Sequence, residues 1–162
     1  MKDEIFGELE EGFACLSKNI VLEFGSIPYN IELQILVDED FDIIKKYQYD
    51  AYKMFMDNWY LIQKDLMDEL IQYYNSERFS WGPDDQEELL KWWPEITSQE
   101  DLLKFMTPES LIISANFGIK YQRLVFLLFS RAWGGEDLDD NGVGVSFLNE
   151  TIDEIGYKDI VY

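Results

Sequence analysis

Residues 45–74, KKYQYDAYKMFMDNWYLIQKDLMDELIQYY, decide the fold of this chain. Apolar residues recur here every three or four positions: Ala51, Phe55, Trp59, Ile62, Leu66, Leu70 and Tyr73. This spacing is the period of an α-helix with one apolar face and one solvated face. We therefore predict one long amphipathic helix over this stretch. Asp42 is the favoured N-cap, and Asp38 and Asp40 are alternatives.

Seven shorter stretches have the composition and spacing of β-strands, three before the helix and four after it. They cover residues 4–10, 13–24, 27–35, 111–117, 124–133, 143–148 and 152–157. Turn residues separate them, Gly25–Ser26 among them. The first two stretches are predicted to form a hairpin around Glu11–Gly12.

Two short helices are predicted between the long helix and the fourth strand. Pro83 is suited to open the first, which runs to Leu90. The Thr97 hydroxyl caps the second, which runs to about Met106 and is ended by Pro108. Residues 1–162 are thus expected to form a single α+β domain. It holds an antiparallel sheet of about seven strands with the long helix packed on one face, and short helices inserted after the third strand.

Charge and composition exclude several classes of protein. The 33 acidic and 13 basic residues give a formal net charge of -20, which repels nucleic acid and anionic membranes and favours a basic protein partner. Cys15 is the one cysteine, so an internal disulfide is ruled out. The N-terminal residues lack a secretory pattern, and no apolar run is long enough to span a bilayer. We expect a cytoplasmic protein.

The absence of histidine removes the commonest general base and the commonest metal-binding nitrogen. Acidic pairs such as Glu87–Glu88, and the run 38–40, could in principle perform acid and base catalysis. In a chain with 33 acidic residues such pairs arise by chance, so we expect no enzyme. A carboxylate-dependent hydrolase stays as an alternative.

The segment 137–142, DLDDNG, reproduces the first six positions of a calcium-binding loop. Asp137, Asp139 and Asn141 would supply the oxygen ligands, which makes calcium the one candidate cofactor. The bidentate carboxylate expected six residues after the glycine falls on Leu148, and the flanks have strand patterns. The competing interpretation is a hairpin in which Asn141–Gly142 takes the positive φ angles of a tight turn. We favour the hairpin and keep a calcium-responsive binding module as an alternative.

Three tryptophans in the irregular segment after the long helix are candidate partner-binding residues: Trp81, Trp92 and Trp93. Exposed aromatic side chains carry much of the binding energy of protein interfaces. Packing in a small satellite core is an equally good interpretation for them. Trp133 ends a strand and is expected in the core.

Several short sequence motifs are spread along most of the chain. They are Ile5–Leu9, residues 48–52 with Phe55, Ile96–Thr97 with Leu102, Leu103 and Pro108, and, near the C-terminus, Trp133, Gly142–Val145 and Ile155–Val161. In this order and spacing they resemble an uncharacterised bacterial domain of unknown function met near polymorphic-toxin and immunity genes. Related sequences open the helix with a threonine after an isoleucine, whereas here Lys45 follows Ile44. The resemblance implies a binding protein and supplies no catalytic residues.

These observations together predict a non-enzymatic acidic domain that binds another protein. The specific form implied by the resemblance is a bacterial immunity protein that neutralises a cognate toxin. The -20 charge would steer a basic toxin towards the domain, and exposed aromatic side chains would hold it.

Overall fold

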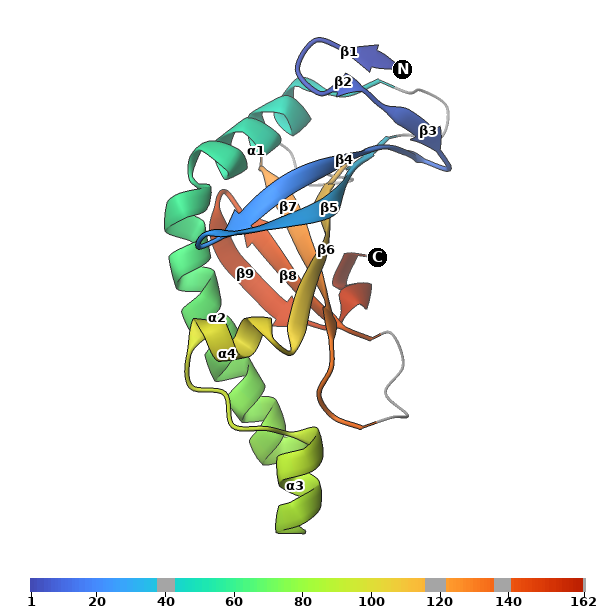
Figure 1. Ribbon diagram of the computed structural model, residues 1–162. Helices are drawn as coiled ribbons and strands as arrows, with labels where there is room; N and C mark the ends of the chain where they lie inside the picture. Colours follow the sequence, from blue (N-terminus) through green and yellow to red (C-terminus); the bar gives the residue numbers. More distant parts are fainter. Residues whose placement is uncertain (38–42, 116–121, 136–140, 162) are drawn as a thin grey trace.

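The computed structural model describes residues 1–37, 43–115, 122–135 and 141–161, and its main feature is one seven-stranded sheet (Figure 1). The sheet strands, in spatial order, are β3 (Glu10–Gly12), β4 (Cys15–Phe24), β5 (Ile27–Leu36), β6 (Met106–Ile113), β7 (Leu124–Arg131), β8 (Val143–Leu148) and β9 (Thr151–Gly156). A separate pair is formed by β1 (Lys2–Asp3) and β2 (Gly7–Glu8). A short 3-10 helix, η1 (Lys158–Val161), follows β9. The predicted α+β class with seven sheet strands is confirmed.

The predicted antiparallel sheet is confirmed except at one pairing. β5 and β6 are parallel, with Leu33 opposite Leu111 and Ile35 opposite Ile113. All the helices of the described chain except η1 lie in the connection between these two strands. A connection of that length crosses over one sheet face and returns to the same end, which makes the strands it joins parallel.

The predicted long helix is two helices, α1 (Lys46–Asp57) and α2 (Trp59–Trp81), which meet at Asn58. The backbone amide of Asn58 and its side-chain Nδ2 both donate to the carbonyl of Met54, at 3.2 and 2.8 Å. The apolar stripe continues across this break, so the periodicity alone could not reveal it. Among the described residues, no helix is long and apolar enough to cross a membrane.

The start of α1 uses a cap different from the predicted aspartate. Lys45 is the N-cap residue and its side chain makes no capping hydrogen bond. Gln48 takes over: its Oε1 accepts from the Lys45 amide at 3.0 Å, and its Nε2 donates to the carbonyls of Leu36 at 2.7 Å and Ser114 at 3.2 Å. This buried amide therefore ties α1 to the ends of β5 and β6. Asp42, like Asp38 and Asp40, lies outside the described residues.

The short helices are shifted from their predicted bounds. α3 (Gln86–Trp92) is capped by Asp85, which accepts from the Glu88 amide at 2.9 Å. α4 (Gln99–Leu103) is capped by Ser98 rather than Thr97. Pro108 does not end a helix but lies inside β6, where the pairing with β7 shifts register between Pro108 and Ser110. A bulge of this kind accommodates a residue that has no backbone N–H.

The N-terminal residues were predicted as one strand and instead fold back on themselves. The Asp3 carboxylate accepts from the amides of Ile5 and Phe6, both at 2.8 Å, and this reverses the chain between β1 and β2. The Tyr49 hydroxyl of α1 donates to the same carboxylate at 2.5 Å. A local turn therefore anchors the N-terminal pair to α1.

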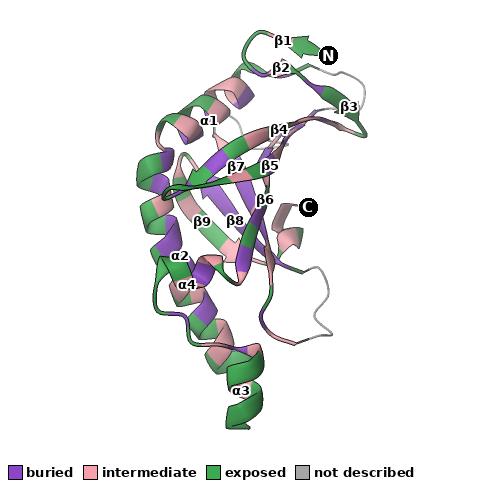
Figure 2. Ribbon diagram, viewed as in Figure 1, coloured by how far each residue is buried: buried purple, intermediate pink, exposed green. Residues whose placement is uncertain are grey.

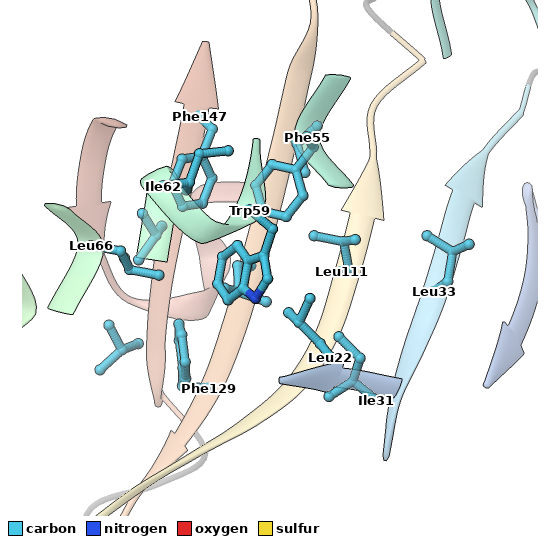
Figure 3. Close-up of a cluster of buried hydrophobic side chains, with 14 of the residues drawn as sticks. Leu22, Ile31, Leu33, Phe55, Trp59, Ile62, Leu66, Leu111, Phe129 and Phe147 are labelled. Carbon is cyan, nitrogen blue, oxygen red and sulfur yellow. The ribbon is translucent and has the colours of Figure 1, made fainter. Parts of the chain in front are cut away.

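The core lies between one sheet face and the apolar stripe that α1 and α2 share (Figures 2 and 3). The Phe55 ring meets the Phe147 ring edge-on at 5.2 Å, and Trp59 meets Phe24 at 5.0 Å. The Trp59 indole also donates to the carbonyl of Glu23 at 2.6 Å. The junction of the two helices is thus packed against β4 on one side and β8 on the other.

Truncation of a side chain at this packing centre should be costly. We expect Phe147→Ala, at a residue that is 0% exposed, to lower the free energy of unfolding by about 3–5 kcal/mol, because it leaves a cavity. Phe13→Ala, at a residue that is 88% exposed, should change it by less than about 0.5 kcal/mol. Urea denaturation of both variants measures the difference. Equal effects would contradict this placement of the core.

The Asp3–Tyr49 contact gives a pH-dependent prediction. Desolvation raises the pKa of Asp3, but hydrogen bonds from the Phe6 amide, the Tyr49 hydroxyl and the Ile5 amide outweigh it and hold the pKa below the ordinary 3.8. A depressed folded pKa means that the stabilisation is present above the ordinary value and is lost as pH falls through the folded value. Tyr49→Phe should therefore cost about 1 kcal/mol at neutral pH and less in acid.

Urea denaturation of Tyr49→Phe at both pH values measures this, and Tyr60→Phe, at an exposed tyrosine of α2, is the control. A cost of Tyr49→Phe that does not change with pH would show that the hydroxyl acts independently of the carboxylate.

Candidate functional site: the exposed aromatic and acidic surface of the α2–α3 arm

α2 continues well past the sheet, and α3 packs beside its far end (Figure 1). We call residues 75–92 the α2–α3 arm. Its bend is at Gly82, where a Cβ would lie 2.4 Å from the Arg78 carbonyl oxygen and 2.7 Å from Leu89. Only glycine fits this close approach. The Arg78 Nε donates to the Trp93 carbonyl at 2.9 Å, which fixes the arm to the chain that leaves it.

The arm carries large aromatic side chains that the core does not use. Phe79 is 93% exposed and Trp81 is 68% exposed, and Leu90 of α3 is also exposed. Trp92, by contrast, is half-buried and packs against the core, with the Lys91 ammonium 4.5 Å from its ring centre. Single exposed apolar residues are ordinary on protein surfaces, but several large ones on one short arm are typical of an interaction surface.

The arm also carries several carboxylates. Asp84, Asp85, Glu87 and Glu88 are all exposed. A shallow depression of about 560 Å³ is lined by Asp85, Glu87, Glu88, Lys91 and Trp92. Within the described part of the chain none of these four carboxylates forms an ion pair. The arm therefore combines apolar contact area with uncompensated negative charge.

The three tryptophans proposed as partner-binding residues are not brought together on one surface. Trp81 is on the surface and Trp92 is half-buried, whereas Trp93 is only 4% exposed. The Trp93 ring lies 6.0 Å from that of Tyr74, whose pKa burial raises to about 12. Trp93 is a core residue in this structure and is not part of the candidate surface. Trp133 is in the core as expected, edge-on to Tyr74 at 4.9 Å.

Sequence reasoning missed Phe79 and Leu90. Phe79 lies off the apolar stripe of α2, which runs through Leu66, Leu70 and Tyr74. A large aromatic residue outside the stripe of an amphipathic helix must point towards solvent or towards another element. That position was the available signal for an exposed aromatic residue.

The calcium prediction falls largely outside the described structure. Asp137 and Asp139 are outside the described residues, and Asn141 is exposed, with its carbonyl accepting from the Lys158 amide at 2.8 Å. Gly142 has a φ of +49°, and a Cβ there would lie 2.3 Å from the Phe129 carbonyl oxygen. Across the described ranges, no three acidic or cysteine side chains are grouped to hold a metal ion. Calcium binding stays a prediction.

Another tight turn has two consecutive residues with positive φ angles. Asn149 and Glu150, which join β8 to β9, have φ angles of 48° and 65°. β7 and β8 are antiparallel neighbours, as the hairpin interpretation expected, but a longer connection joins them.

Comparison with known proteins gives a family and no function. Residues 5–162 match a family described as a domain of unknown function, DUF6985. The chain belongs to this family. No curated protein and no solved structure matches the chain. The DUF6985 match covers the sheet, the helices and the arm alike, so the candidate surface lies within the family domain.

The tryptophans of this DUF6985 domain differ in burial, so truncation of each should have a different effect on the free energy of unfolding. We expect Trp93→Ala to lower the free energy of unfolding by about 3–5 kcal/mol. Trp81→Ala should change it by less than about 0.5 kcal/mol, because solvent already surrounds most of the ring. Urea denaturation compares the two variants. A large loss of stability in Trp81→Ala would place Trp81 in the core and remove it from the candidate surface.

Proposed function

We propose that this DUF6985 domain is a non-enzymatic binding protein that uses the α2–α3 arm to hold a basic protein partner. The observation that carries the proposal is the exposure of Phe79 and Trp81 on the same arm as carboxylates that have no ion-pair partner within the described chain. Neither ring belongs to the core, so their presence on the arm needs another explanation.

The size of these side chains makes them suitable anchors. Aromatic side chains bury about 150–250 Å² each when fully covered, and apolar area contributes about 25 cal/mol per Å². Each such ring can therefore supply several kcal/mol of gross binding energy when it is covered, part of which is offset by the entropy lost on association. The arm is held by Gly82 and Arg78, so little ordering of the backbone is required on binding.

The charge of the domain defines the partner's chemistry. A net charge of -20 accelerates encounter with a basic protein and repels acidic ones. The complementary surface would have an apolar pocket rimmed by lysine or arginine. A toxin protein neutralised by binding is one such partner. The sequence resemblance to domains met near bacterial toxin and immunity genes supports this specific form, in which the domain is an immunity protein.

The test is recovery of a partner by the tagged domain from its host, followed by affinity measurement with both proteins purified. We expect a recovered protein with a basic isoelectric point. Trp81→Ala should weaken its binding by at least about tenfold, because truncation of an aromatic anchor costs 2 kcal/mol or more at an interface. Phe79→Ala should act in the same direction.

Tyr60→Ala is the matched control, because Tyr60 is an exposed aromatic residue of α2 away from the arm. Its effect on affinity should be less than about twofold. A recovered partner that is acidic, or one bound equally well by the Trp81, Phe79 and Tyr60 variants, would contradict the proposed function.

A further inference from the structure

We infer that the edge strand β9 is a docking site for an extended basic segment of a partner protein, which adds to the sheet beside β9 and beneath α2. The inference rests on the proposed function in one respect, that the partner is a basic protein. It concerns a different surface from the arm and a different mode of contact, backbone pairing.

The first observation is the free edge of the sheet. In the described part of the chain, β9 is the last strand in the spatial order and pairs with β8 alone. Among the described residues, the hydrogen bonds outside regular elements do not include the backbone of Thr151–Gly156. The outward N–H and C=O groups of an edge strand are a template for another strand.

The second observation is space beside that edge. α2 runs alongside β9 (Figure 1), and an open groove of about 410 Å³ separates them. Its lining is made by Ile62, Asp65, Asp68, Glu69, Gln72, Glu150, Thr151 and Ile152. The groove thus has α2 on one side and the beginning of β9 on the other. A chain that pairs with β9 would enter it.

The third observation is the chemistry of the wall that α2 presents. Asp65, Asp68, Glu69 and Gln72 are exposed and lie three, four and seven positions apart, so they form a stripe along one side of the helix. Within the described chain no ion pair involves the three carboxylates of this stripe. Glu150, by contrast, is held by Arg123 through two bonds of 2.6 and 2.7 Å. The carboxylates of the groove that have no ion-pair partner among the described residues therefore all lie on α2.

Strand geometry connects the edge to the stripe. A strand added to β9 would lie about 4.8 Å from it, and every second side chain would point towards α2. Side chains on that face are about 7 Å apart, and the stripe from Asp65 to Gln72 is about 10 Å long at 1.5 Å per residue. Two cationic side chains separated by one residue would therefore both lie within the length of the stripe. The fitting segment is extended, with lysine or arginine at alternate positions.

A second copy of this chain fits the edge poorly. β9 carries Asp153 and Glu154, both of which are exposed. Two β9 strands would bring like charges together, which is unfavourable. The same carboxylates attract a basic strand. Charge complementarity therefore selects the basic segment over self-association.

The test uses a labelled nine-residue peptide with lysine alternating with threonine, and a second peptide of the same composition with its lysines contiguous. We expect the alternating peptide to bind more tightly in fluorescence anisotropy. The triple variant Asp65→Asn, Asp68→Asn, Glu69→Gln should weaken it about tenfold. The control triple variant Glu4→Gln, Glu8→Gln, Glu10→Gln removes the same charge from exposed N-terminal residues outside the groove and the arm, and its effect should be less than about threefold.

Amide hydrogen exchange reports the backbone pairing. Exchange of residues 151–156 should slow when the alternating peptide binds, which attraction between charges alone would not produce. Equal affinity for both peptides, equal loss in both triple variants, or unchanged exchange in β9 would overturn the inference. A dimer in sedimentation that protects β9 without peptide would overturn it as well. Because the peptide test does not involve Trp81 or Phe79, its failure is distinguishable from failure of the arm as a partner-binding surface.

Discussion

The packing of the α1–α2 apolar stripe against one sheet face is the constraint on which the rest of the structure depends. Phe55 and Trp59 lie on either side of the helix junction and contact β8 and β4. This contact sets where α2 crosses the sheet and how far it extends beyond it. The exposed arm and the groove along β9 are both consequences of that placement. The arm lies beyond Tyr74, the last buried residue of α2, whereas the groove is lined by α2 residues that precede Tyr74.

Buried polar groups fix the details that apolar packing leaves undetermined. Gln48 is 1% exposed and all its hydrogen bonds are to backbone groups, of Lys45, Leu36 and Ser114. A buried amide with satisfied partners is specific about position, because any shift leaves a donor or an acceptor unpaired. Gln48 therefore sets the start of α1 relative to the parallel pair β5–β6. Arg78 has a comparable role at the other end, where it holds the chain that leaves the arm.

The carboxylates of the domain form ion pairs on some parts of its surface and not on others. On the body, pairs such as Lys46–Asp50 and Arg123–Glu150 neutralise individual carboxylates. On the arm and along the stripe of α2, the carboxylates lack such partners among the described residues. Surface ion pairs contribute little to stability, so their distribution matters more for what the surface attracts. The uncompensated charge lies on the same arm as exposed rings in one place and beside a free strand edge in the other.

Much of the fold could be predicted from the sequence, because it depends on local periodicity. The seven strand patterns and the helical stripe were sufficient for the α+β class and for the sheet face that is buried. The break at Asn58 could not be predicted, because the stripe has the same period on both sides of it. The parallel pairing of β5 with β6 depends on where a long connection returns, which no local pattern records.

For the candidate site, too, some features follow from the sequence and others only from the tertiary structure. The sequence by itself determined the charge of the domain, the lack of imidazole chemistry and the clustering of tryptophans after the long helix. Only the tertiary structure decided that Trp93 is buried while Trp81 is exposed, although both lie close together in the sequence. It also decided that β9 is an edge strand and that the side of α2 bearing Asp65 faces a groove beside it. The physical reason is that exposure and strand order depend on contacts between distant residues, whereas composition and periodicity are properties of neighbours along the chain.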